Sequence, residues 1–253
     1  MILSFNIEYR TNWGEEVKLA GLSTESTPMY TTDGIYWTAE VELEVPQEGL
    51  TIHYSYQIEQ NGIVIRKEWN NFPRCLFLSG TPRKKYRIND CWKNIPEQLY
   101  LYSSAFTEAL LSHPEREDIP QGYKKGLIIK AYAPRINKDY CLAICGNQKA
   151  LGNWDPEKAV LMSDFNFPEW QVELDASKLK YPLEYKFILC HKQERKIDCW
   201  EKNPNRYLAD PEIKTNETLV ISDRYVYFDI PMWKGAGIAI PVFSLKSEKS
   251  FGV

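Results

Sequence analysis

The feature that most constrains the fold of this chain is an internal repeat. The segment IHYSYQI at residues 52–58 corresponds to LEYKFIL at 183–189, and IRKEWNNFPR at 65–74 corresponds to KIDCWEKNPNR at 196–206. Two diverged copies of one sequence unit specify the same elements twice, so the chain is expected to contain two similar domains. Its 253 residues are enough for both, with 43% apolar residues to form their cores.

Each copy has the pattern of an all-β domain. In the first copy, VKLAGL (17–22), YWTAEVELEV (36–45) and LTIHYSYQI (50–58) alternate apolar with polar residues and are rich in Val, Ile, Tyr and Trp. Turn residues such as QNG at 60–62 separate them. Short alternating strands at this spacing predict two immunoglobulin-like antiparallel β-sandwich domains with no disulfide across them.

The composition and the repeat together predict four segments. A first copy spans 1–92, a linker 93–122, a second copy 123–230, and a further segment 231–253. The linker contains SSAFTEALL, whose capping serine and helical spacing predict one short helix. The last segment contains AGIAIPVFSL, a nearly continuous apolar run that is typical of a strand buried on both faces in a parallel barrel. We therefore interpret it as the start of a truncated barrel domain.

Charge, cysteine and histidine usage narrow the possible partners. The net charge is −3 and there is no run of Lys and Arg, so neither nucleic acid nor an anionic membrane surface is an expected partner. No leader or spanning segment is visible, and a cytoplasmic location is expected. The three histidines lack metal-ligand spacing with any cysteine, so no metal and no cofactor is expected. Cys141 and Cys145 fall on one face of a predicted strand, as core thiols do.

Two tryptophans of the second copy are the leading candidates for a binding site. Trp154 ends LGNW and Trp200 ends the strand before EKNPNR, and a small sandwich can bring these loops together. Two indoles present a large, mostly apolar surface that suits the C–H face of a sugar ring. Lys186, Glu201 and Asn205 are available to bond the sugar hydroxyls. The alternative is that Trp200 belongs to the core and Asn205 to a turn.

The second copy resembles a known family. The run LGNWDPEKAVLM, FPEWQVEL, LEYKFIL and DCWEKNPNRYL is similar to the starch-binding domain, carbohydrate-binding module family 20, over nearly all of residues 127–225. This resemblance implies that stacking tryptophans fall on Trp154 and Trp200 and that Trp170 is a packing residue. It also implies polar sugar contacts, which fall on the residues Lys186, Glu201 and Asn205.

The first copy resembles the same family but departs from its pattern. It has no LGxW, Ser55 replaces the lysine and Asn70 replaces the glutamate. Trp69 corresponds to Trp200, which implies a candidate sugar contact at Trp69. The family also has a second, looser site around an aromatic residue before a Gly-Glu pair, which implies a contact at Trp13 in TNWGEEV. The second copy is non-aromatic near the equivalent position, Ile136, so the copies are expected to divide the two sites between them.

Tandem domains of this kind followed by GAGIAIPVFSLKSEKSFGV are similar to the 4-alpha-glucanotransferases of the amylomaltase type, glycoside hydrolase family 77. The resemblance implies a retaining parent enzyme that acts on α-1,4-glucans, with its acids beyond Val253. The chain itself is then expected to have no turnover, and to bind starch, maltodextrin or glycogen for the catalytic domain of the same parent. Two alternatives stay open: a glucan-targeting adaptor without an enzymatic parent, and a sandwich pair used for protein contact.

Overall fold

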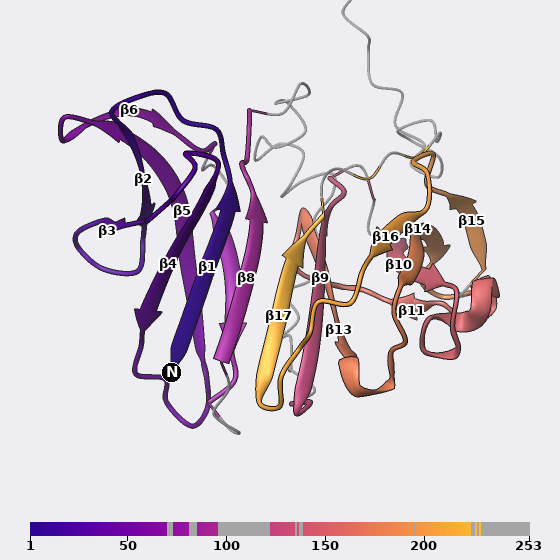
Figure 1. The fold of residues 1–253 in the computed structure, drawn as a ribbon. Helices are drawn as coiled ribbons and strands as arrows, with labels where there is room; N and C mark the ends of the chain where they lie inside the picture. Colours follow the sequence, from indigo (N-terminus) through magenta and orange to yellow (C-terminus); the bar gives the residue numbers. More distant parts are fainter. Residues whose placement is uncertain are drawn as a thin grey trace, which may run out of the picture.

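A computed structural model describes most of the chain, and its strands lie in both copies (Figure 1). The described residues are 1–69, 73–80, 85–95, 122–134, 136, 139–194, 196–223, 226 and 228. The predicted linker helix and the predicted barrel strand lie outside these residues.

The first copy folds as eight β-strands in two layers. Their bounds are β1 (Ile2–Glu8), β2 (Glu15–Ala20), β3 (Thr27–Pro28), β4 (Tyr36–Glu42), β5 (Leu50–Gln60), β6 (Ile63–Lys67), β7 (Arg74–Leu78) and β8 (Lys85–Cys91). One layer has the order β8-β1-β4, and the other has the order β3-β2-β5-β6 with β7 also paired to β5. β4 and β5 alternate buried and exposed or half-buried residues along most of their lengths, as the sequence predicts for strands with one face on a core.

The second copy repeats this arrangement with nine strands. Their bounds are β9 (Lys125–Tyr132), β10 (Tyr140–Gly146), β11 (Val160–Leu161), β12 (Ser163–Asn166), β13 (Glu169–Asp175), β14 (Leu183–His191), β15 (Ile197–Trp200), β16 (Arg206–Leu208) and β17 (Glu217–Ser222). Short 3-10 helices connect them: η3 (Lys149–Trp154), η4 (Pro156–Lys158) and η5 (Ala176–Lys178). One layer has the order β12-β13-β9-β17, and the other β11-β10-β14-β15 with β16 also paired to β14. The predicted all-β sandwich architecture is confirmed.

The sequence did not predict that the two copies share a sheet. β17 of the second copy pairs in parallel with β8 of the first, Val220 opposite Ile88, and this joins the two large layers into one seven-stranded sheet (Figure 1). β17 also pairs in parallel with β9, and β8 pairs in parallel with β1. The remaining pairs of this sheet are antiparallel, so the sheet mixes both strand directions. The copies are therefore joined by a backbone ladder in addition to the connecting chain.

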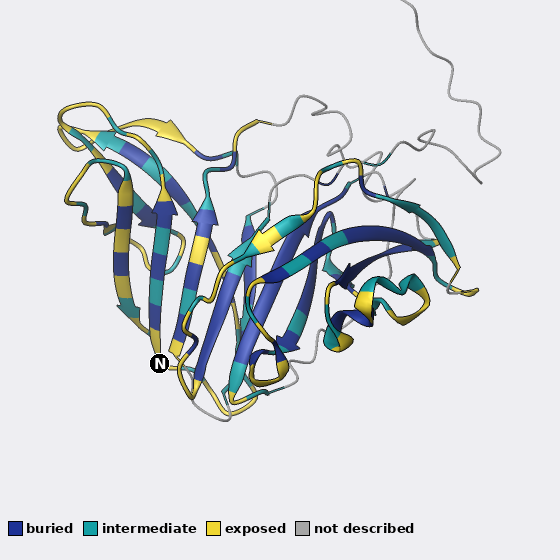
Figure 2. Cartoon of the chain, turned by 45° about the vertical axis from the view of Figure 1, so that its right-hand side comes forward, coloured by how far each residue is buried: buried dark blue, intermediate teal, exposed yellow. Residues whose placement is uncertain are grey.

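The strands at this junction contribute to two cores, one on each face of the shared sheet. Ile128 of β9 and Val220 of β17 pack with the core of the first copy. Leu127, Ile129 and Leu219, on the same two strands, pack with the core of the second copy. β9 is consequently buried along nearly its whole length, whereas β4 at the far edge of the sheet alternates (Figure 2). Burial on both faces explains why GLIIKAYA is apolar except for Lys130.

Charged side chains also cross the junction. Arg87 of β8 pairs with Glu217 of β17 at 3.0 Å, and its guanidinium donates to the carbonyl oxygen of Pro211. The buried Lys130 ammonium of β9 lies 2.9 Å from the Glu169 carboxylate and donates to the backbone carbonyl of Cys75 in β7. Because the Lys130 charge is buried, these acceptors compensate the loss of water, and they tie the first copy to the second.

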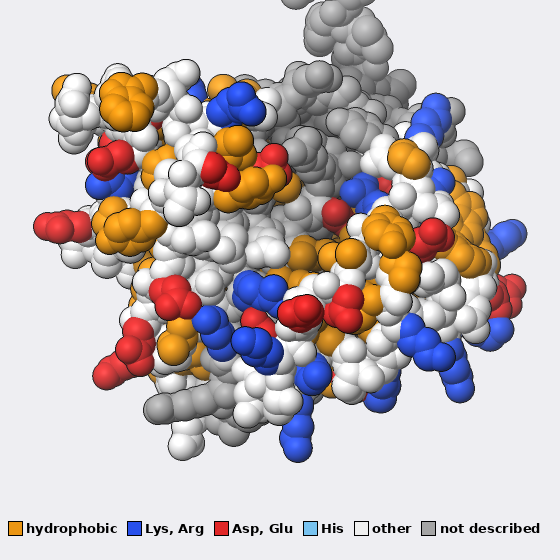
Figure 3. Space-filling model, viewed as in Figure 1, with side chains coloured by type: hydrophobic (Ala, Val, Ile, Leu, Met, Phe, Trp, Pro, Cys, Tyr) orange, Lys and Arg blue, Asp and Glu red, His pale blue; other side chains and the backbone are white. Residues whose placement is uncertain are grey.

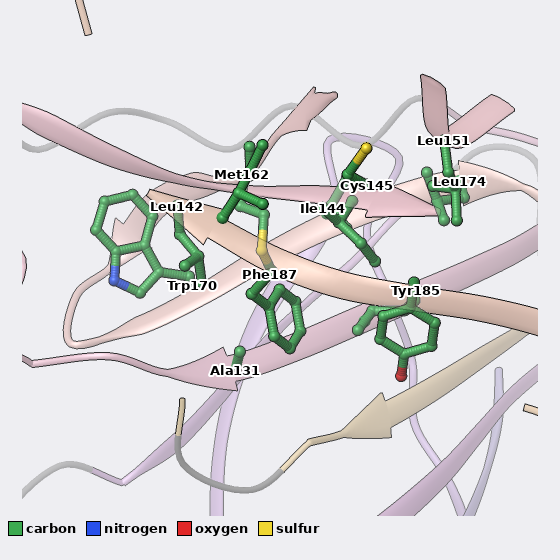
Figure 4. Packing of buried hydrophobic residues seen from close by; sticks show 14 of the residues in the cluster. Ala131, Leu142, Ile144, Cys145, Leu151, Met162, Trp170, Leu174, Tyr185 and Phe187 are labelled. Carbon is green, nitrogen blue, oxygen red and sulfur yellow. The ribbon is translucent and has the colours of Figure 1, made fainter. Parts of the chain in front are cut away.

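The core of the second copy contains one tryptophan, which lies at one end of the group of side chains shown in Figure 4. Trp170 of β13 is fully buried, and its indole N–H donates to the carbonyl oxygen of Ala133 at 3.2 Å. Its assignment as a packing residue agrees with this position. Cys141 and Cys145 are buried thiols outside any disulfide, and the Cys141 thiol donates to the carbonyl oxygen of Cys190 at 3.5 Å. Among the described residues, no helix is long and apolar enough to span a bilayer.

Candidate functional site

The tryptophan pair predicted from the sequence is brought together in the second copy. The ring centroids of Trp154 and Trp200 lie 6.2 Å apart with an angle of 46° between the ring planes. Trp200 ends β15, and Trp154 ends the 3-10 segment η3. Both side chains are half-buried, and Trp200 packs on the core at its edge. Trp200 therefore packs against the core and also keeps part of its ring at the surface.

A strained backbone presents Trp154. Gly152, Asn153 and Trp154 have φ angles of 82°, 52° and 61°, in the left-handed region. Gly and Asn adopt this region readily, but a bulky residue such as Trp does so at a cost of about 1–3 kcal/mol. A Cβ on Gly152 would lie 2.9 Å from the backbone of Lys158, so only glycine fits there. The sequence LGNW is therefore specific for this loop conformation.

Of the three polar residues predicted to contact sugar beside the tryptophan pair, two are half-buried or exposed and one is buried. Lys186 is half-buried on β14, and its ammonium donates to the backbone carbonyl of Glu201 at 3.4 Å. Asn205 is exposed in the loop that follows β15. Lys186 is two residues along β14 from Ile188, the ladder partner of Trp200, and Asn205 follows Trp200 by five residues.

The buried one of the three is Glu201, whose side chain points to the opposite face of the sheet. Its carboxylate has no exposed surface and receives two hydrogen bonds from Arg206, at 2.8 and 3.1 Å, and one from the Phe187 N–H at 2.8 Å. The prediction that Glu201 contacts sugar directly is therefore wrong. Alternation along the strand places Trp200 outward and Glu201 inward, so the carboxylate fixes the loop instead of facing a ligand.

Glu201 belongs to a buried polar network of four residues, Tyr185, Glu201, Arg206 and Asp223. The Tyr185 hydroxyl donates to Asp223 at 2.6 Å, and Arg206 lies 3.5 Å from the same carboxylate. Burial raises the pKa of Asp223 above its ordinary value. Burial lowers the pKa of Arg206, but the bonds to Glu201 and the charge of Asp223 outweigh it and leave that pKa raised. The guanidinium therefore stays charged and anchors the loop between β15 and β16.

The first copy contains the same network, formed by Tyr54, Glu68, Arg74 and Asp90. Arg74 donates to Glu68 at 2.7 and 3.2 Å and to Asp90 at 3.0 Å, and the Tyr54 hydroxyl donates to Asp90 at 3.0 Å. The match of all four residues is independent structural support for the internal repeat.

This network corrects the sequence alignment of the two copies. Because Glu68 is the counterpart of Glu201, the residue that corresponds to Trp200 is Lys67, and Trp69 lies two positions further on. The Trp69 ring instead lies 6.0 Å from the Lys93 ammonium. Asn70, which the sequence aligned with the glutamate, lies outside the described residues. Ser55 precedes Tyr56, the counterpart of Phe187, so its correspondence to Lys186 stands.

Trp13 of the first copy is the most exposed aromatic residue among those that the structure describes. It is 99% exposed at the tip of the turn between β1 and β2. The Glu15 carboxylate holds this turn by accepting from the Asn12 N–H at 2.8 Å and from the Asn12 amide at 3.0 Å. These bonds lower the pKa of Glu15, the backbone bond most. A firm turn that presents a whole indole to solvent is typical of a binding contact.

Tyr30 is a second strongly exposed aromatic residue of the first copy, and the sequence patterns described above did not point to it. Its side chain is 71% exposed. Pro28 pairs with Lys18 of β2, and the Met29 N–H donates to the carbonyl oxygen of Val17, so the backbone just before Tyr30 lies near the start of β2. That start is where the turn bearing Trp13 ends. The signal that identifies Tyr30 is an aromatic residue directly before the turn sequence TTDG.

The chain is similar in sequence to a known domain family and to a known enzyme. Residues 129–220 match the family model described as "Starch binding domain". Over 277 aligned residues, 25% are identical to the 4-alpha-glucanotransferase DPE2 of Oryza sativa subsp. japonica; the alignment covers 99% of this chain and 28% of that protein. The chain therefore spans little more than a quarter of the length of this relative.

Solved structures are similar at lower identity. The family 20 carbohydrate-binding module of a maltotetraose-forming amylase from Pseudomonas saccharophila STB07 is 17% identical, covering 39% of this chain and 99% of that one, with a TM-score of 0.32. A family 15 glucoamylase from Hypocrea jecorina is 21% identical, covering 48% of this chain and 19% of that one, with a TM-score of 0.35.

Proposed function

We propose that this protein binds α-1,4-glucans such as starch, maltodextrin or glycogen through the second copy, without turning them over, and the match of residues 129–220 to the starch binding domain family model supports this. The observation that carries the proposal is the tilted pair of Trp154 and Trp200 at 6.2 Å. Lys186 lies on the same face of β14 as Ile188, the ladder partner of Trp200, and Asn205 is exposed in the loop after β15. Glu201 supports the site from beneath through Arg206.

The chemistry of the pair suits a curved glucan. An indole ring offers an apolar face to the C–H groups on one side of a glucose ring, and the hydroxyls at the rim then need hydrogen-bond partners. Two indoles whose planes differ by 46° follow two consecutive sugars that are themselves tilted to each other. The Lys186 ammonium and the Asn205 amide can bond the hydroxyls at that rim.

The role in a larger protein is a finer part of the proposal. The similarity to the rice 4-alpha-glucanotransferase runs along 99% of this chain, which corresponds to 28% of that enzyme. We infer that the two sandwiches hold polysaccharide for a glucanotransferase catalytic domain of the same parent chain, in the cytoplasm. Such a domain would supply the two carboxyl groups that retaining glycosyl transfer requires.

Calorimetric titration with maltoheptaose tests the proposal. The wild-type protein is expected to bind with a dissociation constant on the order of 10 μM to 1 mM, because a shallow surface gains little from desolvation. Trp154→Ala and Trp200→Ala should each weaken binding by about 1–3 kcal/mol, as loss of one aromatic stacking platform does. Tyr36→Ala, which removes an exposed aromatic from β4 of the first copy, serves as the control and should leave affinity unchanged.

Two results would count against this function. No binding of maltoheptaose or soluble starch by the wild-type protein at millimolar sugar would leave protein contact as the better interpretation. Release of sugar from maltotriose by the purified protein would overturn the assignment of the acids to another domain.

A further inference from the structure

The surface beside the tryptophan pair carries a third aromatic side chain that the function above does not use. Tyr207 lies in β16 and is 64% exposed. In the ladders of β14, Trp200 is opposite Ile188 and Tyr207 is opposite Glu184. Directly opposed residues of paired strands project to the same face, and so do residues two and four apart along one strand. Tyr207 therefore shares a face with Trp200.

Lys186 occupies the position between these two levels of β14, on the same face. The order along the strand is then Ile188 with Trp200, Lys186, and Glu184 with Tyr207. From Ile188 to Glu184 the strand advances by about 13 Å, given a rise of about 3.3 Å per residue. The exposed Asn205 lies in the loop that leads into β16, two residues before Tyr207. Polar groups thus fill the interval between the tryptophan pair and the tyrosine.

Among the residues that the structure describes, none packs on Tyr207 so as to bury it, since its side chain is 64% exposed. Its neighbours in β16 face the interior, since Arg206 bonds Glu201 and Leu208 packs on the core. These neighbours and the ladder to β14 hold the Tyr207 backbone in a fixed place. The space-filling view shows hydrophobic side chains at the surface among charged ones over the region of β14 to β16 (Figure 3). An exposed aromatic ring on a fixed strand is pre-organised for stacking, because little motion is lost on binding.

We propose that Tyr207 is a third stacking platform, which takes a glucose residue further along the chain than those on Trp154 and Trp200. This inference rests on the proposed glucan binding and deepens it. The binding surface of the second copy is then longer than two sugars, and it selects for chain length. Maltose contacts the tryptophan pair alone, whereas a longer oligosaccharide also reaches Tyr207.

Calorimetric titrations of the full chain with maltose and with maltoheptaose separate the two sites. Tyr207→Ala should weaken maltoheptaose binding by about fivefold or more, in line with loss of one aromatic platform, and change maltose binding by less than about twofold. Tyr207→Phe keeps the ring and should bind both sugars like the wild type. Ile63→Ala removes a similarly exposed side chain from β6 of the first copy and should change neither affinity. The melting temperature of Tyr207→Ala should equal that of the wild type.

The outcomes are distinguishable. Unchanged maltoheptaose affinity in Tyr207→Ala, with normal wild-type binding and a loss in Trp200→Ala, overturns the third platform and leaves the proposed function intact. Equal losses for maltose and maltoheptaose, or a lowered melting temperature, show that Tyr207 acts through the fold and also overturn it. If the wild-type protein binds neither maltose nor maltoheptaose, both the proposed function and the third platform are wrong.

Discussion

At the scale of single residues, the alternation of a strand decides what a sequence motif means. Trp200 and Glu201 are adjacent in the chain and were predicted to serve one ligand, but they face opposite sides of the sheet. The outward residues Trp154, Trp200 and Lys186 were predicted from the sequence and lie together. The inward role of Glu201 was not predictable without Arg206 and Phe187 as its partners, because those contacts depend on the fold.

The buried role of Glu201 leads to a stability prediction. Glu201→Ala leaves Arg206, which is only 14% exposed, without its main partner. Loss of one member of a buried ion pair is expected to lower the free energy of unfolding by about 3–5 kcal/mol. Denaturant unfolding followed by circular dichroism measures this change. Glu68→Ala, the equivalent change in the first copy, should be comparably destabilising, whereas Glu157→Ala at the surface should not. A Glu201→Ala protein of normal stability that fails to bind glucan would restore the direct sugar contact.

At the scale of elements, the strands were predictable and their partners were only partly so. Alternating segments predicted β4, β5 and β14, because the period of two is set by each strand locally. The alignment of Trp69 with Trp200 was wrong by two residues, because Glu68 follows its backbone partner Tyr56 by 12 residues whereas Glu201 follows the equivalent Phe187 by 14. The alignment between the two copies is established by the polar network, in which Glu68 corresponds to Glu201.

The backbone conformation of the η3 segment leads to a prediction for Gly152. Gly152→Ala forces an unfavourable left-handed residue and a close approach to the Lys158 backbone, which should displace Trp154. We expect weaker maltoheptaose binding, by several-fold or more. The matched control is Gly62→Ala, which has a similar φ of 77° but nothing within 4 Å. Both variants should lose about 1–2 kcal/mol of stability, and only Gly152→Ala should lose affinity in the titration. Equal affinities would mean that the loop does not position Trp154.

At the scale of the whole molecule, the seven-stranded sheet makes the two copies one structural unit. The sequence predicted separate sandwiches joined by a linker, because the choice of β17 to pair with β8 is not encoded in local alternation. The sequence did contain a signal in the nearly continuous apolar run of β9, which is buried against both cores. A run of this kind in an otherwise alternating domain indicates a strand between two packed layers.

The shared sheet predicts cooperative unfolding. Because Ile128 and Val220 belong to the first copy's core while their strands belong to the second copy, neither copy keeps its core if the other unfolds. Differential scanning calorimetry should show one transition with equal calorimetric and van't Hoff enthalpies. Val220→Asp places an unpaired charge in the junction and should lower the melting temperature or split the transition. Val64→Asp on the exposed strand β6 is the control. Two transitions in the wild type would contradict the shared sheet.

The same rigidity predicts how Trp13 contributes. A long glucan that contacts both copies gains from an effective concentration that reaches about millimolar for short tethers, provided that the geometry allows both contacts. Trp13→Ala should therefore weaken binding to amylose or glycogen and leave maltoheptaose affinity nearly unchanged. Surface plasmon resonance with both ligands measures the difference. Equal losses of affinity for the short and the long ligand would mean that Trp13 acts through folding. No loss of affinity for either ligand would mean that the first copy serves only as a spacer.

The central claim is that the Trp154 and Trp200 rings form the glucan site, and the indole N–H resonances of the eight tryptophans test it most directly. In ¹H–¹⁵N spectra recorded during a maltoheptaose titration, the signals of Trp154 and Trp200 should shift together along one binding isotherm, while those of the buried Trp37 and Trp170 stay in place. Single Trp→Phe variants assign the signals. Unmoved Trp154 and Trp200 resonances at saturating sugar, with shifts elsewhere in the protein, would contradict this site.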